Sequence, residues 1–150
     1  MNIRTIDIEL INFFHRISLP IARFGLFVVF FYFGLLKVIG LSPASGLVQQ
    51  LFEQTISFIS FNSFIVLFGL FECLIGIFFI IPGFERVVIP MLFLHMMMTF
   101  MPLFVLPEMT WSRFLVPTLE GQYIIKNLVI IAAAIAIAAH LHPLSKSRFG

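Results

Sequence analysis

The chain has few charged residues and only one cysteine. Asp, Glu, Lys and Arg make up 11% of its 150 residues, whereas hydrophobic residues make up 61%. A soluble domain usually carries about 25% charged residues. The polar surface is therefore too small to cover a compact chain of this length in water. This scarcity of charge excludes an ordinary soluble domain and predicts a membrane protein.

Other absences exclude several kinds of chemistry. Because Cys73 stands alone, the chain has no internal disulfide, no Cys-x-x-Cys redox pair and no cysteine zinc site. The net charge of +2 is scattered, which argues against a nucleic-acid-binding face. Consecutive methionines at 96–98 point in different directions around a helix, as do His140 and His142, so neither group predicts a metal or haem site. No arrangement typical of a hydrolase appears, and we predict no catalytic residue.

Four apolar stretches are long enough to cross a bilayer as helices, which requires roughly 17 to 25 residues each. They cover about residues 20–40, 63–81, 87–106 and 123–141. Lone strands would leave backbone groups unpaired in lipid, so helices are expected. The sequence predicts an all-α membrane protein, in which a single domain forms an antiparallel four-helix transmembrane bundle.

Two further segments, residues 1–19 and 43–60, carry apolar side chains at helical spacing and predict amphipathic helices on the membrane surface. The first segment mixes basic and acidic residues and has no small-residue cleavage site, so it does not resemble a secretory signal. Its apolar positions are Ile3, Ile6, Leu10, Phe13, Phe14 and Ile17.

The basic residues of the connecting segments predict the orientation, because cytoplasmic loops are enriched in Lys and Arg. If the N-terminus is cytoplasmic, the outer loops receive only Arg113. The cytoplasmic side then receives five basic residues, which are Arg4, Arg16, Arg86, Lys146 and Arg148. We therefore expect both termini in the cytoplasm.

Polar and small residues fall on one face of each predicted span. Small residues let membrane helices approach closely, so the glycines predict helix contacts. Arg23 and His140 lie at the cytoplasmic ends of their spans. The small residues of this kind are Gly34, Gly69 and Gly76, and the other polar ones are Lys37, Glu72, His95, Thr99 and Lys126.

Glu72 lies about nine residues from either end of its span, near the bilayer midplane. An ionised carboxylate there costs at least a few kcal/mol, so it needs a cationic partner or a proton. One interpretation is a site that exchanges protons or binds a quinone or lipid headgroup. The other is an ion pair that only fixes helix register. The candidate residues for this site are Lys37, Glu72, His95 and Lys126.

Four segments resemble the DoxX-like superfamily, including four-span proteins linked to reactive-chlorine resistance in bacteria. They are "RFGLFVVFFYFGLLK" (23–37), "GLFECLIGIFFIIPGFER" (69–86), "PEMTW" (107–111) and "EGQYIIKNLVIIAAA" (120–134). The resemblance implies a four-helix protein of the bacterial inner membrane. Members of the superfamily are small subunits of terminal quinol oxidases or thiosulfate–quinone oxidoreductases, and others take part in oxidative-stress responses.

We expect an accessory subunit of a quinone-linked redox or oxidative-stress complex, in contact with membrane lipid and with partner subunits or further copies of itself. Quinone is the one cofactor candidate, and Lys37, Glu72 and Lys126 would contact it. Electron transfer would then occur in a partner or through the bound quinone. Two alternatives remain: a membrane assembly protein without chemistry of its own, and a small proton-coupled transporter.

Overall fold

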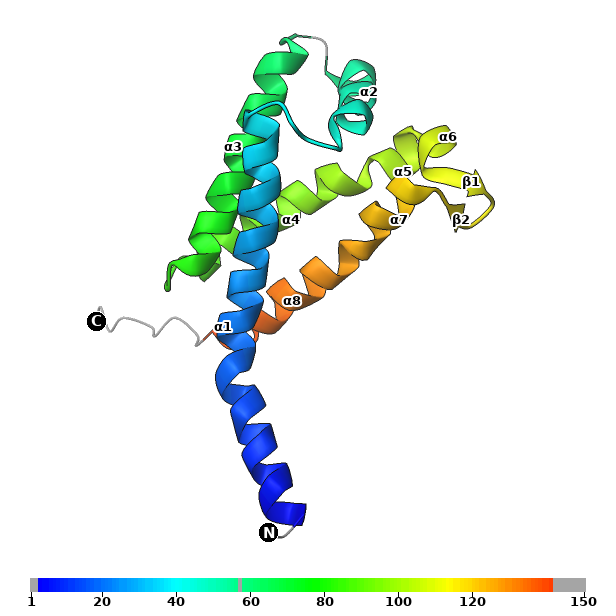
Figure 1. The fold of residues 1–150 in the computed structure, drawn as a ribbon. Helices are drawn as coiled ribbons and strands as arrows, with labels where there is room; N and C mark the ends of the chain where they lie inside the picture. Colours follow the sequence, from blue (N-terminus) through cyan, green and yellow to red (C-terminus); the bar gives the residue numbers. More distant parts are fainter. Residues whose placement is uncertain (1–2, 57, 142–150) are drawn as a thin grey trace, which may run out of the picture.

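The computed structural model describes residues 3–56 and 58–141, which are mostly helical (Figure 1). The helices are α1 (Ile3–Val38), α2 (Ser45–Thr55), α3 (Phe61–Ile80), α4 (Glu85–Phe100), α5 (Pro102–Val105), α6 (Pro107–Thr110), α7 (Leu119–Lys126) and α8 (Leu128–Ala138). Between α6 and α7, β1 (Trp111–Arg113) pairs with β2 (Val116–Pro117) in a two-stranded antiparallel hairpin.

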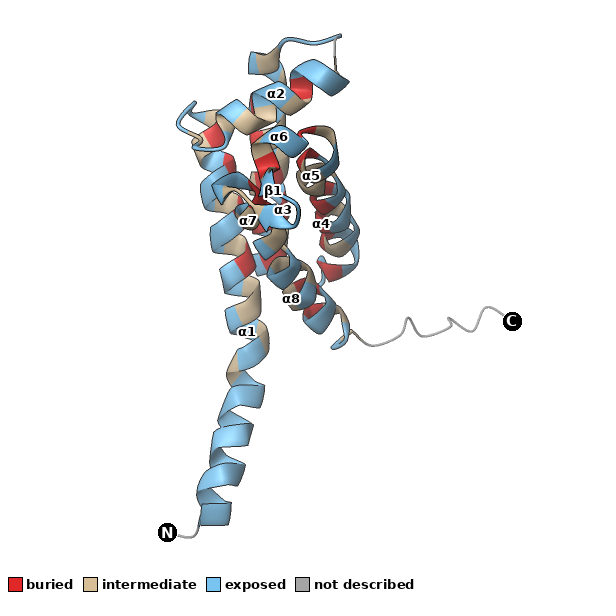
Figure 2. Ribbon diagram, turned by 90° about the vertical axis from the view of Figure 1, so that its right-hand side faces the viewer, coloured by how far each residue is buried: buried red, intermediate tan, exposed pale blue. Residues whose placement is uncertain are grey.

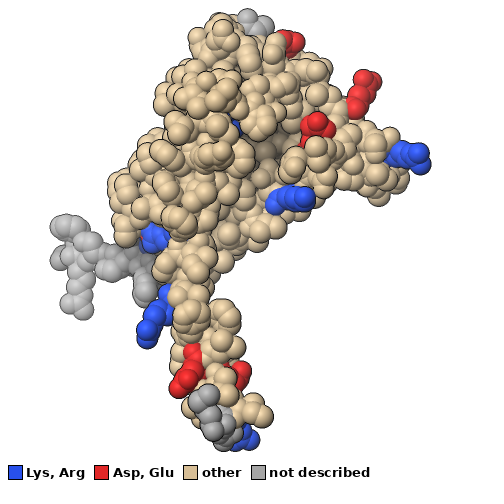
Figure 3. Space-filling model, in the orientation of Figure 1, with Lys and Arg blue, Asp and Glu red and all other residues tan. Residues whose placement is uncertain are grey.

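Four helical stretches of the described residues are long and apolar enough to cross a membrane, which confirms the prediction of a multi-pass helical protein. They are Ile3–Val38, Phe61–Ile80, Glu85–Val105 and Leu119–Ala138. At most 33% of the most apolar part of any stretch is buried inside the protein. Most of this apolar surface therefore faces outward, as in a protein whose solvent is lipid. On the face drawn in Figure 3, acidic side chains lie toward the two extremities, and between them is an expanse without acidic residues.

Local sequence explains where the helices begin and end. Gly40 follows α1 with φ +74°, and Gly83 lies between α3 and α4 with φ +93°, a region that glycine enters without strain. The Ser60 side chain accepts a hydrogen bond from the Ser63 backbone N–H and caps α3. Thr118 caps α7 in the same way through the N–H of Gly121. These residues convert the continuous apolar sequence into separate helices.

The core lies where α1, α3, α4 and α8 face one another, and Figure 2 shows the buried residues on these inward faces. Nine buried side chains form it: Leu26, Phe30, Ile75, Phe79, Val88, Leu92, Met96, Ala134 and Ile137. The predicted surface helix of residues 43–60 corresponds to the shorter α2, which packs on α3 through Phe52, whose ring centroid lies 4.9 Å from that of Phe64.

The first helix differs from the prediction. A separate surface helix over residues 1–19 was expected, but α1 continues through Pro20 from Ile3 to Val38. Proline removes one backbone hydrogen bond but keeps a φ that suits a helix, so the chain need not break there. At 1.5 Å per residue the helix is about 54 Å long, more than the ~30 Å hydrocarbon core of a bilayer.

One exposed apolar stripe follows α1 on both sides of Pro20. The positions are three, four, seven or eight residues apart, and these spacings keep them on one helical face. They are Ile3, Ile6, Leu10, Phe13, Ile21, Phe24, Val28 and Leu35. The N-terminal part of α1 projects away from the other helices (Figure 2), and the stripe residues on it are exposed.

Candidate functional site

Glu72 lies between a lysine and a histidine from two other helices. One carboxylate oxygen, Oε2, accepts a hydrogen bond from Lys37 Nζ of α1 at 2.6 Å. The other, Oε1, lies 2.8 Å from His95 Nε2 of α4. Both oxygens of the α3 carboxylate are thus engaged, and the three predicted residues Lys37, Glu72 and His95 form one ion network.

The network is buried in an apolar environment. Glu72 and His95 are each 5% exposed and Lys37 is 6% exposed. Among the described residues, every buried side-chain nitrogen or oxygen has a hydrogen-bond partner. A buried carboxylate needs this compensation, because removing its charge from water costs several kcal/mol unless partners replace the lost hydration.

Thr99 extends the network by one residue along α4. Its Oγ1 lies 3.2 Å from His95 Nδ1 and donates to the His95 carbonyl oxygen at 3.0 Å. Thr99 is half-buried, whereas the three charged residues are buried. A continuous path of polar atoms therefore runs from Lys37 to a less enclosed hydroxyl.

Aromatic rings enclose the charged groups. The Phe68 ring stacks on the His95 ring with centroids 5.0 Å apart and planes inclined by 9°. Phe30 meets the same imidazole edge-on at 5.3 Å. Lys37 Nζ lies 5.6 Å from the Phe68 centroid, close enough for a cation–π attraction. These rings keep water away and fix the imidazole plane.

Close contact between α1 and α3 brings Lys37 to Glu72. A Cβ atom placed on Gly34 would lie 2.6 Å from the Gly69 carbonyl oxygen, and one on Gly69 would lie 2.7 Å from the Gly34 carbonyl oxygen. Each glycine stands three residues before a charged partner, on the same helical face. Farther along α3, a Cβ on Gly76 would lie 2.8 Å from the Phe31 backbone nitrogen. The three glycines thus lie where the helix backbones touch.

The fourth candidate of the predicted site lies elsewhere. Lys126 is exposed at the end of α7, and its Nζ lies 5.4 Å from the centroid of the Tyr123 ring. His140 follows α8, is also exposed, and donates from Nδ1 to the Ala136 carbonyl oxygen at 2.8 Å. Within the part of the chain that the structure describes, neither Lys126 nor His140 contacts Glu72.

Arg23 forms a second ion pair, with a residue that the sequence reasoning missed. Its Nη2 lies 2.6 Å from Glu85 Oε1, and its Nε and Nη2 donate to the carbonyl oxygens of Phe79 and Ile81. The guanidinium thus closes the carboxyl end of α3 and ties α1 to the start of α4. An acid in the first turn of a helix, two residues after the Pro82-Gly83 break, is the signal that could have identified Glu85.

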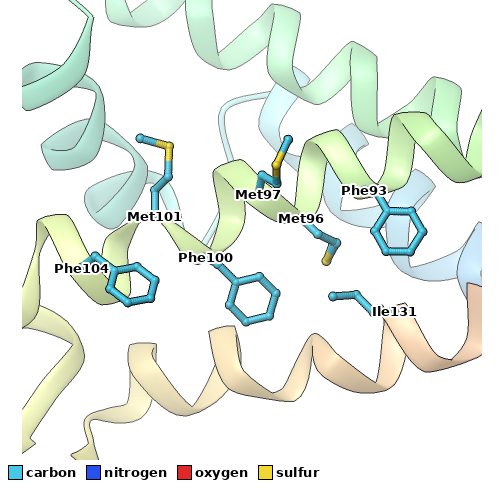
Figure 4. Close-up of a pocket in the computed structure, with 7 residues that line it drawn as sticks. All are labelled: Phe93, Met96, Met97, Phe100, Met101, Phe104 and Ile131. Atoms are coloured by element: carbon cyan, nitrogen blue, oxygen red, sulfur yellow. The ribbon is translucent and has the colours of Figure 1, made fainter.

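An apolar groove of about 380 Å³ lies between α4, α5 and α8 (Figure 4). The methionine run contributes to it, with no polar side chain among the lining residues. These include Phe93, Met96, Met97, Phe100, Met101 and Ile131. Within residues 3–56 and 58–141, no three His, Cys, Asp or Glu side chains are placed to hold a metal ion. The groove therefore suits a hydrocarbon chain rather than an ion.

Comparison of the chain with family models, curated proteins and solved structures gives no match. The resemblance to the DoxX-like superfamily rests on the four sequence segments alone.

Proposed function

We propose that the four long helices form an antiparallel bundle in the bacterial inner membrane and that the protein is an accessory subunit of a quinone-linked redox or oxidative-stress complex. The DoxX-like resemblance supports the choice of complex. The observation that carries the proposal is the buried network of Lys37, Glu72, His95 and Thr99. A protein that only spans a membrane has no need of a carboxylate in its interior, where it is costly to insert.

The network can hold either of two proton arrangements without moving a heavy atom. With a neutral imidazole, Nε2–H donates to Glu72 and the Thr99 hydroxyl donates to Nδ1. With a protonated imidazole, Nδ1–H donates to Thr99 Oγ1, whose hydrogen turns to the His95 carbonyl oxygen. Every group stays satisfied in both arrangements, so rotation of one hydroxyl is enough to accept or release a proton.

The donors of the network suit a quinone headgroup. Quinone carbonyl oxygens accept hydrogen bonds, and Lys37 Nζ and His95 Nε2 are donors that now serve Glu72. A bound quinone would supply the electron chemistry, with protons taken up on its reduction. The residues of this chain would orient a carbonyl oxygen and pass it a proton. The same donors would hold a lipid phosphate, which is the related headgroup candidate.

Substitution of Glu72→Gln tests this proposal. The complex is first purified in mild detergent, and its subunits and bound small molecules are identified by native mass spectrometry. We expect Glu72→Gln to leave assembly intact and to lower quinone-dependent turnover about 100-fold, the usual size of a lost proton-transfer step. Thr99→Val should lower turnover in the same direction, because it removes the rotating hydroxyl.

Glu53→Gln is the matched control, because Glu53 lies outside the ion network. It is exposed on α2, and its carboxylate accepts a hydrogen bond from the Gln49 side chain. It should leave turnover unchanged. Normal turnover in an assembled Glu72→Gln complex would eliminate the proton-exchange role.

The second candidate function is an assembly protein whose buried charges only fix helix positions. The contact of Gly34 with Gly69 favours it, because this contact and the ion pair together define one register of α1 on α3. In that case Glu72→Gln would preserve both assembly and turnover, whereas Gly76→Leu would prevent assembly. The turnover of the assembled Glu72→Gln complex therefore separates the two functions, and Gly76→Leu tests whether assembly depends on the close helix contact.

A further inference from the structure

The tip of the hairpin between α6 and α7 is apolar and uncovered. Phe114 is 91% exposed and Leu115 is 73% exposed. Leu115 has φ +59°, and among the described residues it is the one residue other than glycine with positive φ. Turns usually place Gly or Asn in that conformation. A leucine there keeps an apolar side chain at the tip where a smaller residue would fit with less strain.

Hydrogen bonds hold the hairpin in place from several sides. Trp111 Nε1 donates to the Leu103 carbonyl oxygen at 3.0 Å, and Ser112 Oγ donates to that of Val116 at 3.0 Å. At its base, the backbone N–H of Thr118 donates to the Thr110 carbonyl oxygen. Thr110 itself is fully buried. The exposed tip is therefore part of a fixed structure.

The position of the hairpin brings it to the surface of a membrane. It connects Glu85–Val105 with Leu119–Ala138, two stretches able to cross the bilayer. Figure 1 shows it projecting from the end of these helices, on the side away from α1 and α3. Trp111 and Arg113 both lie on β1, which leads into the tip, and tryptophan and arginine are residues of the membrane–water interface.

We propose that Phe114 and Leu115 insert into the phospholipid leaflet next to this end of the protein, with Arg113 at the level of the lipid phosphates. Apolar tip residues gain by leaving water, and the guanidinium complements the phosphate charge. The inserted tip would anchor the connection between α5 and α7 to the membrane surface. This anchor is independent of the quinone proposal, because it uses none of the residues of the ion network.

The test uses tryptophan fluorescence, because Trp111 is the one tryptophan of the sequence. A Trp111→Phe, Phe114→Trp double variant carries the fluorophore at the tip. It is reconstituted in phosphatidylcholine vesicles, with or without lipids brominated on the acyl chains. We expect emission at shorter wavelength than in water, strong quenching by the brominated lipids, and weak quenching by iodide.

Two control variants in the Trp111→Phe background calibrate the result. Leu70→Trp lies at an exposed position within α3 and should report lipid, and Gln50→Trp lies on the polar face of α2 and should report water. Phe114→Trp emission and quenching like those of Gln50→Trp would overturn the proposal and mark the tip as a water-facing surface for a partner protein. If the Trp111→Phe background fails to fold, a nitrobenzoxadiazole label on Phe114→Cys, Cys73→Ser gives the same comparison.

Discussion

At the scale of single residues, the Glu72 carboxylate contacts two partners on different helices. Lys37 binds one carboxylate oxygen and His95 approaches the other. The three groups are buried, so each depends on the others for the hydrogen bonds that water would otherwise supply. Replacement of one charged member by an apolar residue should therefore be worse than replacement of the Lys37–Glu72 pair.

We predict that Lys37→Met destabilises the folded protein by about 3 kcal/mol, because it leaves the buried carboxylate without its cation. The double variant Lys37→Met, Glu72→Leu should recover most of this loss, since no uncompensated charge remains. Unfolding in sodium dodecyl sulfate, followed by Trp111 fluorescence, measures both. Lys126→Met is the matched control and should change stability by less than about 0.5 kcal/mol, because Lys126 is exposed.

The double variant also provides the contradicting outcome. Glu72→Leu is also measured alone. If the free-energy losses of Lys37→Met and Glu72→Leu add up to that of the double variant, the coupling energy is zero and the ion pair does not stabilise the fold.

At the scale of elements, the contact between α1 and α3 determines where the charged residues meet. The backbones touch at Gly34 and Gly69, where any side chain would collide with a carbonyl oxygen. In contrast, a Cβ on Gly25, also in α1, would have no neighbour within 4 Å. The same helix thus contains one glycine required by packing and one that packing does not require.

We predict opposite effects for alanine at these two glycines. Gly34→Ala should destabilise the protein by about 1–3 kcal/mol, because the added methyl group forces α1 from α3. Gly25→Ala should stabilise it by about 0.5–1 kcal/mol, because alanine favours a helix more than glycine does. Thermal unfolding of both variants in one detergent measures the difference. Equal shifts in the midpoint would show that the close contact does not limit stability.

Helical periodicity was sufficient to predict the members of the ion network, because polar residues inside an apolar helix gather on the face away from lipid. Periodicity failed to place Lys126, because the prediction that the polar residues of the span 123–141 share one face assumes one regular helix. The structure instead has α7 ending at Lys126 and α8 beginning at Leu128. Contacts between helices also depend on crossing angles that one sequence does not reveal.

Two further features were beyond sequence reasoning for local reasons. A proline is compatible both with the start of a helix and with its interior, so Pro20 did not reveal that α1 continues. The hairpin strands are three and two residues long, and one contains Pro117, so no alternating pattern marks them.

At the scale of the whole molecule, the four long apolar helices favour four crossings of a membrane, and we predict that four crossings place both ends of the chain on the same side. The basic residues Arg4, Arg16 and Arg86 favour the cytoplasm for that side, with Arg113 opposite. Lys146 and Arg148, which strengthen the prediction, lie outside the described residues.

We predict that Thr5→Cys is labelled from the cytoplasm and Gln50→Cys from outside, each in a Cys73→Ser background. Both positions are exposed, so accessibility depends only on the side of the membrane. A membrane-impermeant maleimide applied to spheroplasts should modify Gln50→Cys alone, and it should modify both after permeabilisation. The reverse pattern would invert the assigned orientation, and labelling of both in sealed spheroplasts would contradict four crossings.

The unbroken course of α1 has a consequence for its angular phase. Each residue advances a helix by about 100°. One residue inserted beside Pro20 would therefore rotate the apolar stripe before the insertion by about 100° relative to the stripe after it. Seven residues make nearly two turns and would restore the alignment. The length of α1 before the bundle can therefore change in steps of about seven residues, but not one at a time, while the stripe remains a single surface.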